Sequence, residues 1–155
     1  MTSEQSLTSR DFPVHWPALT RWTDNDMFGH LNNAVYYQLF DTAINQWLIA
    51  GTGVDVLTAP TLVLTAESGC RFLREVGFPQ PVVVGVRVRR IGRSSVVYQL
   101  GLFADDSSAV AVGHWVHVYV DRASRRSVEM PADVRRLLQT ALDEPAPDGA
   151  LAGEH

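Results

Sequence analysis

The sequence predicts an α+β fold in which one long, buried helix lies against an antiparallel sheet of about five strands. Two observations predict it. The segment 33–50 is largely apolar and contains neither glycine nor proline, whereas the segment 61–121 alternates apolar and polar residues in four runs separated by short turns. A chain of 155 residues suits one compact domain, which we expect over 11–142, with flexible tails at 1–10 and 143–155.

The helix is predicted over 33–50. Its polar residues Gln38, Asp41 and Asn45 follow the spacing i, i+3, i+7 and form a narrow stripe, while the rest of the circumference is apolar. A helix of this composition is expected to be buried and wrapped by a sheet. Gly51 and Gly53 are expected to end it.

The strands follow from period-two alternation and from turn residues between the runs. Upstream of the helix, 15–22 predicts one further strand, which Pro17 places at an edge or a bulge. Pro131 is expected to open a short closing helix. The four later strands are predicted over 61–73, 81–91, 95–104 and 108–121.

Two of these strands carry predictions about their faces. In 61–73 the even-numbered residues, including Leu64 and Cys70, are expected to share the apolar face. In 108–121 the valines alternate in step, which predicts that they face the core together with His114, and that His117 points the other way.

Composition restricts the possible functions. The formal net charge of −4 and the pI of about 5.6 argue against general affinity for nucleic acid or anionic membranes, and no apolar run is long enough to span a bilayer. The N-terminus lacks the apolar core of a signal peptide, and the single cysteine, Cys70, fits a reducing compartment, so we expect a cytoplasmic protein. Without Cys-x-x-Cys or His-x-x-x-His patterns, we expect no metal.

Polar residues crowd the loop between the first predicted strand and the helix. This segment contains Thr23, Asp24, Asn25, Asp26, His30, Asn32 and Asn33. Asn32 or Asn33 can cap the helix, and Gly29 permits a tight turn or close approach of a ligand. The N–H groups at a helix N-terminus polarise a carbonyl, and a nearby carboxylate attacks it or activates water. A capped structural loop has the same composition, so spacing alone leaves both interpretations open.

The segment from Arg21 to Tyr36 reads Arg-x-x-Asp-x-Asp-x-x-Gly-His-x-Asn-Asn-x-x-Tyr. This pattern resembles the signature of the hotdog-fold thioesterases of the 4-hydroxybenzoyl-CoA thioesterase type, including the acyl-CoA thioester hydrolase branch. The resemblance extends over about 12–140, through the motif beginning at Gly92 and through Pro131. It implies a central helix wrapped by an antiparallel sheet. It also implies an acyl-CoA substrate and homodimers or tetramers with active sites at subunit interfaces.

The resemblance also implies roles for individual residues. Asp26 matches the catalytic carboxylate, either nucleophile or general base, and Asn33 matches the position whose backbone N–H binds the thioester oxygen. His30 is expected to orient Asp26 or to line the acyl pocket. Asp24 is expected to be structural, paired with backbone or with Arg21. The substrate-binding residues are expected to be Gly29, Asn32 and Phe28 in the loop, with Arg89, Arg90, Arg93 and Ser94 around the coenzyme A phosphates.

Alternatives remain open at this point. Glu67 is the second candidate carboxylate. The coenzyme A counts as part of the substrate, so no separate cofactor is expected. The same fold could also hydrate an enoyl-CoA, although the spacing of aspartate and histidine differs and the Asn-Pro of such hydratases is absent, or it could bind acyl-CoA without turnover.

Overall fold

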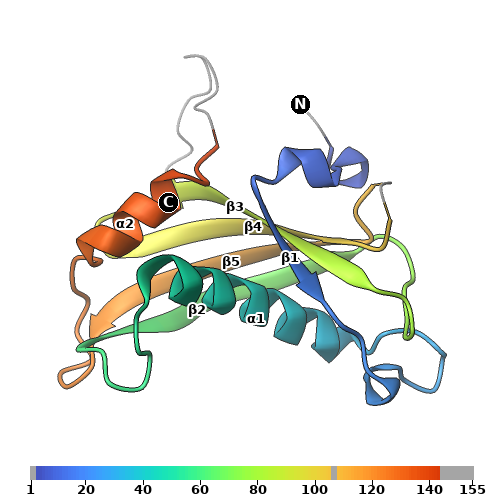
Figure 1. Ribbon diagram of the computed structural model, residues 1–155, viewed down its shortest axis with the longest axis horizontal. Coiled ribbons are helices and arrows are strands. Elements are labelled where there is room, and N and C mark those ends of the chain that lie inside the picture. The colour runs from blue at the N-terminus through green and yellow to red at the C-terminus, as the bar shows by residue number, and fades with distance from the viewer. Residues whose placement is uncertain (1–2, 106–107, 144–155) are drawn as a thin grey trace.

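A computed structural model describes residues 3–105 and 108–143. Five antiparallel strands form one sheet in the order β1-β3-β4-β5-β2, and helix α1 lies across one face of it (Figure 1). The main elements are β1 (Val14–Ala18), α1 (Asn33–Thr52), β2 (Thr61–Phe72), β3 (Val82–Ile91), β4 (Ser95–Phe103), β5 (Ala111–Asp121) and α2 (Ala132–Gln139). This arrangement is the α+β architecture that the sequence predicts.

Helix α1 begins and ends as its local sequence dictates. Asn32 caps it, because its side-chain Oδ1 accepts the Ala34 N–H at 3.0 Å. Gly53 adopts φ 68° and donates its N–H to Ile49 O, so it ends the helix in the left-handed conformation that suits glycine. Gly51 does not end the helix. A Cβ there would lie 2.5 Å from a methyl of Leu137, so its role is to let α2 approach α1.

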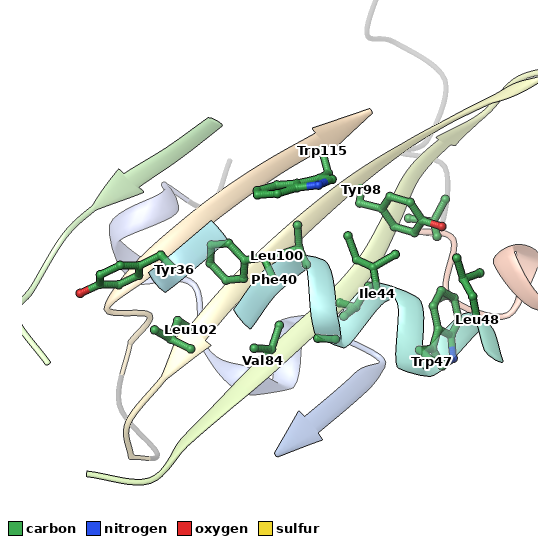
Figure 2. Packing of buried hydrophobic residues seen from close by; sticks show 14 of the residues in the cluster. Tyr36, Phe40, Ile44, Trp47, Leu48, Val84, Tyr98, Leu100, Leu102 and Trp115 are labelled. Atoms are coloured by element: carbon green, nitrogen blue, oxygen red, sulfur yellow. The ribbon is translucent and has the colours of Figure 1, made fainter. Parts of the chain in front are cut away.

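The main core lies between α1 and the sheet. Phe40 and Ile44 are fully buried on the helix, opposite Val84, Leu100 and other apolar residues of the central strands (Figure 2). A second, smaller cluster covers part of the opposite face and includes Leu7, which is 2% exposed. Residues 3–10, expected as a tail, therefore pack on the domain, whereas 144–155 lie outside the described residues.

The predicted face of β2 is wrong over its first half. A bulge between Thr65 and Glu67 shifts the register against β5. Before the bulge Val63 packs on the core and Leu64 is 41% exposed, while after it Cys70 packs on the core. The extra residue at the bulge reverses which face each side chain occupies, and alternation alone contains no signal for it.

The predicted face of β5 is also wrong. Trp115, His117 and Tyr119 are buried, whereas Val116 and Val118 are half-buried on the opposite face. His114 is exposed and lies 3.2 Å from Glu67. Valine is favoured on both faces of a strand, so its alternation does not identify the core side. Aromatic residues fill the space next to α1 instead.

The remaining predictions about the elements are confirmed with adjusted ends. Within the described part of the chain, β1 pairs with β3 alone and is an edge strand, as Pro17 predicts. It ends at Ala18 rather than Trp22, which belongs to a short 3-10 helix, Trp22–Asp24. Among the described residues, no helix is both long and apolar enough to cross a bilayer.

Candidate active site

Asp24 anchors the loop that joins β1 to α1. Its side chain is almost fully buried, and its Oδ2 accepts the Arg21 backbone N–H at 2.7 Å. Its Oδ1 accepts the Arg21 guanidinium N–H groups at 2.9 and 3.1 Å, and its carbonyl accepts the Asn32 N–H. All these partners are local. The carboxylate is therefore committed to holding the loop in place, which agrees with the structural role predicted for it.

Asp26 occupies a tight turn whose hydrogen bonds fix its carboxylate. Its N–H donates to His30 O at 2.9 Å, and its carbonyl accepts the Gly29 N–H at 3.1 Å. Its Oδ1 accepts the Phe28 N–H at 2.9 Å. Gly29 has φ 82°, a conformation that a residue with a side chain adopts only with strain. The carboxylate is thus held in one orientation while it remains partly open to solvent.

The first turn of α1 supplies a hydrogen-bond donor beside this carboxylate. Asn32 accepts the N–H groups of Ala34, through its side chain, and of Val35, through its carbonyl. Within the described residues, the Asn33 N–H has no acceptor. Helix N-termini carry a partial positive charge, so this N–H suits an oxygen that becomes negative during reaction.

Asp26 and Asn33 line the same open groove, which has a volume of about 490 Å³. One wall comes from the loop and α1, and the other comes from the end of β2 and the residues after it. The lining residues are Asp26, Phe28, His30, Leu31, Asn33, Tyr36, Phe72, Leu73, Arg74 and Glu75. The groove therefore combines a fixed carboxylate with an unoccupied backbone donor.

Glu75 and Tyr36 are two of the groove residues that were not predicted as site residues. A carboxylate oxygen of Glu75 lies 3.0 Å from His30 Nε2. Next to this pair, the Leu31 N–H donates a hydrogen bond to the Val76 carbonyl, which joins the two backbone segments. The Tyr36 ring packs on Phe72 at 4.9 Å, and Figure 2 shows its hydroxyl pointing out of the core cluster. Burial, and after it the charges of Cys70, Asp26 and Glu75, raise the Tyr36 pKa. Tyr36 follows Asn33 by three positions, a spacing that indicates a shared helix face, whereas nothing near Glu75 in sequence indicates its location.

Comparison with known proteins agrees with this geometry. Residues 20–138 match the family model described as "Thioesterase-like superfamily". The chain belongs to this superfamily. Its membership confirms the predicted hotdog thioesterase family, and with it the predicted enzyme class, thioester hydrolase.

Individual relatives cover most of the chain. The crystal structure of the PA5185 protein from Pseudomonas aeruginosa superposes with a TM-score of 0.86 at 39% identity, over 90% of this chain and 98% of that one. A Thermus thermophilus thioesterase complexed with coenzyme A and Zn has a TM-score of 0.71 at 25% identity, over 83% and 98%. An Agrobacterium fabrum L-carnitine dehydrogenase/betainyl-CoA thioesterase is 29% identical over 85% of this chain, which spans 28% of that protein's length.

The arginines expected to hold coenzyme A lie away from the groove of this thioesterase-like domain. The Asp26 loop follows Ala18, which pairs with Val82 at the start of β3, whereas Arg89, Arg90 and the turn at 92–94 lie at the other end of that strand. Ten residues of strand separate the two ends by roughly 30 Å. A single chain therefore does not bring these arginines to Asp26.

Local contacts already involve this turn. Arg89 forms an ion pair with Asp143 at 2.9 Å. The Ser94 hydroxyl accepts a hydrogen bond from Ser127 at 2.8 Å, and Arg135 donates to the carbonyls of Gly92 and Arg93. The two Arg135 bonds join the turn to α2, and Arg90 and Arg93 are exposed at this end of the sheet.

Glu67, the second candidate carboxylate, lies outside the groove. It sits on β2 beside the bulge and pairs with His114 on the sheet face opposite to α1. Within the part of the chain that the structure describes, no three His, Cys, Asp or Glu side chains are grouped closely enough to hold a metal ion.

Proposed function

We propose that this domain hydrolyses acyl-CoA thioesters in the groove that contains Asp26. The observation that carries the proposal is the pairing of a fixed carboxylate with the free N–H of Asn33 in one groove. A thioester needs little more, because its carbonyl is more electrophilic than that of an amide and its thiolate is a good leaving group. Family membership and the coenzyme A bound to the Thermus relative support this substrate class.

The chemistry can follow two routes from the same geometry. In both, the thioester carbonyl oxygen accepts the Asn33 N–H, which stabilises the negative charge that develops on it. As a nucleophile, Asp26 attacks the carbonyl carbon, the C–S bond breaks, coenzyme A leaves as thiolate, and water hydrolyses the resulting anhydride. As a general base, Asp26 takes a proton from water as the water oxygen attacks the carbonyl carbon; the C–S bond then breaks, which releases the acid and coenzyme A thiolate.

The other loop residues support Asp26 in this proposal. The His30 carbonyl holds the Asp26 N–H, and the His30 ring, paired with Glu75, forms a wall of the groove. Asn32 accepts the N–H groups of Ala34 and Val35, which leaves the Asn33 N–H available to a substrate. Gly29 provides the turn, and Phe28, 86% exposed, is available to contact the acyl group.

In this proposal the coenzyme A phosphates contact arginines of a second copy of the chain. Arg89, Arg90, Arg93 and Ser94 lie at the end of β3 that is remote from Asp26 of the same chain. The outer edge of β2 supports assembly into a homo-oligomer, because among the described residues this strand pairs with β5 alone, and residues 64–68 at its middle are exposed. Cytoplasmic location stays a prediction from the sequence.

Thiol release measured across a panel of acyl-CoAs tests the proposal. The panel should include short and long aliphatic, aromatic and betainyl thioesters, the last because of the name of the Agrobacterium relative. We expect Asp26→Asn to lose at least about 100-fold in kcat while keeping the wild-type oligomeric state. Glu67→Gln is the matched control and should retain activity.

Two outcomes would contradict the proposal. Wild-type turnover by Asp26→Asn would exclude the mechanism. Binding of acyl-CoA without thiol release from any thioester would instead favour a non-hydrolytic binding protein. Loss of the enoyl absorbance of crotonyl-CoA without thiol release would indicate a hydratase.

A further inference from the structure

The ring of Tyr36 is fixed in the wall of the Asp26 groove. Tyr36 is 3% exposed, and its ring packs edge-on against that of Phe72 with 4.9 Å between the ring centroids. It lies on α1 three residues after Asn33, and helical side chains lean toward the N-terminus of their helix. The ring therefore extends back toward the start of α1, and Figure 2 shows its hydroxyl pointing away from the other labelled residues of the core.

The hydroxyl of Tyr36 is unpaired and open to the groove. Among the described residues, it forms no hydrogen bond. The hydroxyls of Tyr98 and Tyr119 also lack partners there, but they are cut off from solvent, whereas that of Tyr36 is not. Because packing fixes the ring and leaves only the O–H free to rotate, Tyr36 presents a hydrogen-bond donor at a defined position in the groove.

At neutral pH the Tyr36 hydroxyl is a donor rather than a base. Burial, and after it the charges of Cys70, Asp26 and Glu75, raise its pKa above the ordinary value of 10.0. The phenol therefore keeps its proton at neutral pH and does not remove one from water. The influence of the Asp26 charge on this pKa agrees with the place of both side chains in one groove.

The cationic donors of the groove are already engaged. The Arg74 guanidinium donates to the Ser108 carbonyl, and the His30 ring is paired with a carboxylate at 3.0 Å. By contrast, the Asn33 N–H and the Tyr36 hydroxyl have no acceptor within the described part of the chain. Residues at i and i+3 share a face of a helix, so these two donors enter the groove from the same side. Such a pair suits one oxygen atom that gains negative charge during a reaction.

We propose that the Tyr36 hydroxyl and the Asn33 N–H together bind the carbonyl oxygen of the thioester. This inference rests on the proposed hydrolysis of acyl-CoA in the Asp26 groove. When the nucleophile adds to the carbonyl carbon, an electron pair of the C=O bond moves onto the oxygen, and both donors stabilise the resulting charge. The pair returns when the C–S bond breaks, so Tyr36 keeps its proton throughout. This role is the same whether Asp26 attacks the carbonyl carbon or activates water.

Thiol release by Tyr36→Phe, measured with the acyl-CoA that wild type cleaves fastest, tests this role. The variant keeps the ring on Phe72 and loses only the hydroxyl. We expect kcat to fall at least about tenfold and KM to change less than about threefold, because a hydrogen bond to the oxygen strengthens as charge develops. The urea midpoint should stay at the wild-type value, since the hydroxyl has no partner among the described residues. Tyr37→Phe, whose ring packs on Trp115 outside the groove, is the matched control and should keep the wild-type kcat.

The vibration of the thioester carbonyl shows whether the hydroxyl contacts this oxygen. Asp26→Asn should bind the same acyl-CoA without cleaving it, so infrared difference spectra with an isotope-labelled carbonyl report its hydrogen bonds. Adding Tyr36→Phe to this variant should raise the carbonyl stretching frequency. If Asp26→Asn is inactive, an unchanged kcat in Tyr36→Phe or an unchanged frequency overturns this inference and leaves the proposed function intact. Absence of thiol release by wild type, or normal release by Asp26→Asn, overturns the proposed function and this inference with it.

Discussion

Lowering the pH should destabilise this protein through His117. Its side chain is 1% exposed, and neither ring nitrogen has a hydrogen-bond partner among the described residues. Burial lowers the His117 pKa from 6.5 to about 4. Between these values the unfolded chain binds more protons than the folded one. The free energy of unfolding therefore has its full value above pH 6.5 and decreases as the pH falls toward 4.

The size of this effect follows from the two pKa values. They differ by about 2.5, and one pKa unit corresponds to about 1.4 kcal/mol, so complete protonation costs about 3 kcal/mol. At pH 5 the linkage relation gives a loss of about 2 kcal/mol relative to pH 7.5. For a domain of this size, that is a large share of the free energy of unfolding.

Urea unfolding at pH 7.5 and pH 5.0 measures the effect against two variants. His117→Phe retains an aromatic ring beside Tyr98 but does not titrate. Between the two pH values its free energy of unfolding should therefore decrease by about 2 kcal/mol less than that of wild type. His114→Gln replaces a histidine that is half-exposed, and it should follow wild type. Carboxylates whose pKa is lowered, such as Asp55 and Asp121, contribute equally to the pH dependence of stability in all three proteins. An equal loss in His117→Phe and wild type would refute the reasoning.

Three further predictions concern the loop and the thiol. Asn32→Ala removes the cap that accepts the Ala34 N–H and should lower the free energy of unfolding by about 1 kcal/mol in urea, whereas Asn32→Asp should retain most of it. Asp24→Asn weakens charge-assisted bonds from Arg21 and should cost about 2 kcal/mol in the same assay; an unchanged midpoint would contradict the anchoring role. Burial raises the Cys70 pKa from 9.0 to about 12, so at pH 8 it should react with a disulfide reagent at least about 100-fold more slowly than in urea, and equal rates would show that the thiol is accessible.

The elements, and the closeness of Asp26 to the start of α1, could be predicted because their signals are local. The helix, its cap at Asn32 and the succession of strands along the chain follow from periodicity and turn residues over a few positions. Asp26 and Asn33 are seven residues apart, and hydrogen bonds within the same loop fix Asp26. Such a segment carries its geometry in its own sequence.

The errors arise where distant segments decide the structure. The bulge at Thr65 depends on the pairing of β2 with β5, and it reverses the faces that alternation predicts. His117, rather than His114, is buried because the side of β5 that faces α1 is the aromatic side. Glu75 reaches His30 from a loop 45 positions later in the sequence, and no local pattern indicates that contact.

The burial of α1 gives its two ends different chemistry. At the N-terminus, the capping residue Asn32 takes the N–H groups of the next two residues, so a single backbone donor remains beside Asp26. At the C-terminus, Gly51 lets α2 approach, and the pocket that remains there is lined mostly by apolar residues, with Asp133 as the one charged residue among the described residues of its lining. Negative charge on a bound group is therefore favoured at the first end by the helix dipole and disfavoured at the second end by Asp133. A ligand with a negatively charged group should therefore favour the end of α1 that carries Asn33.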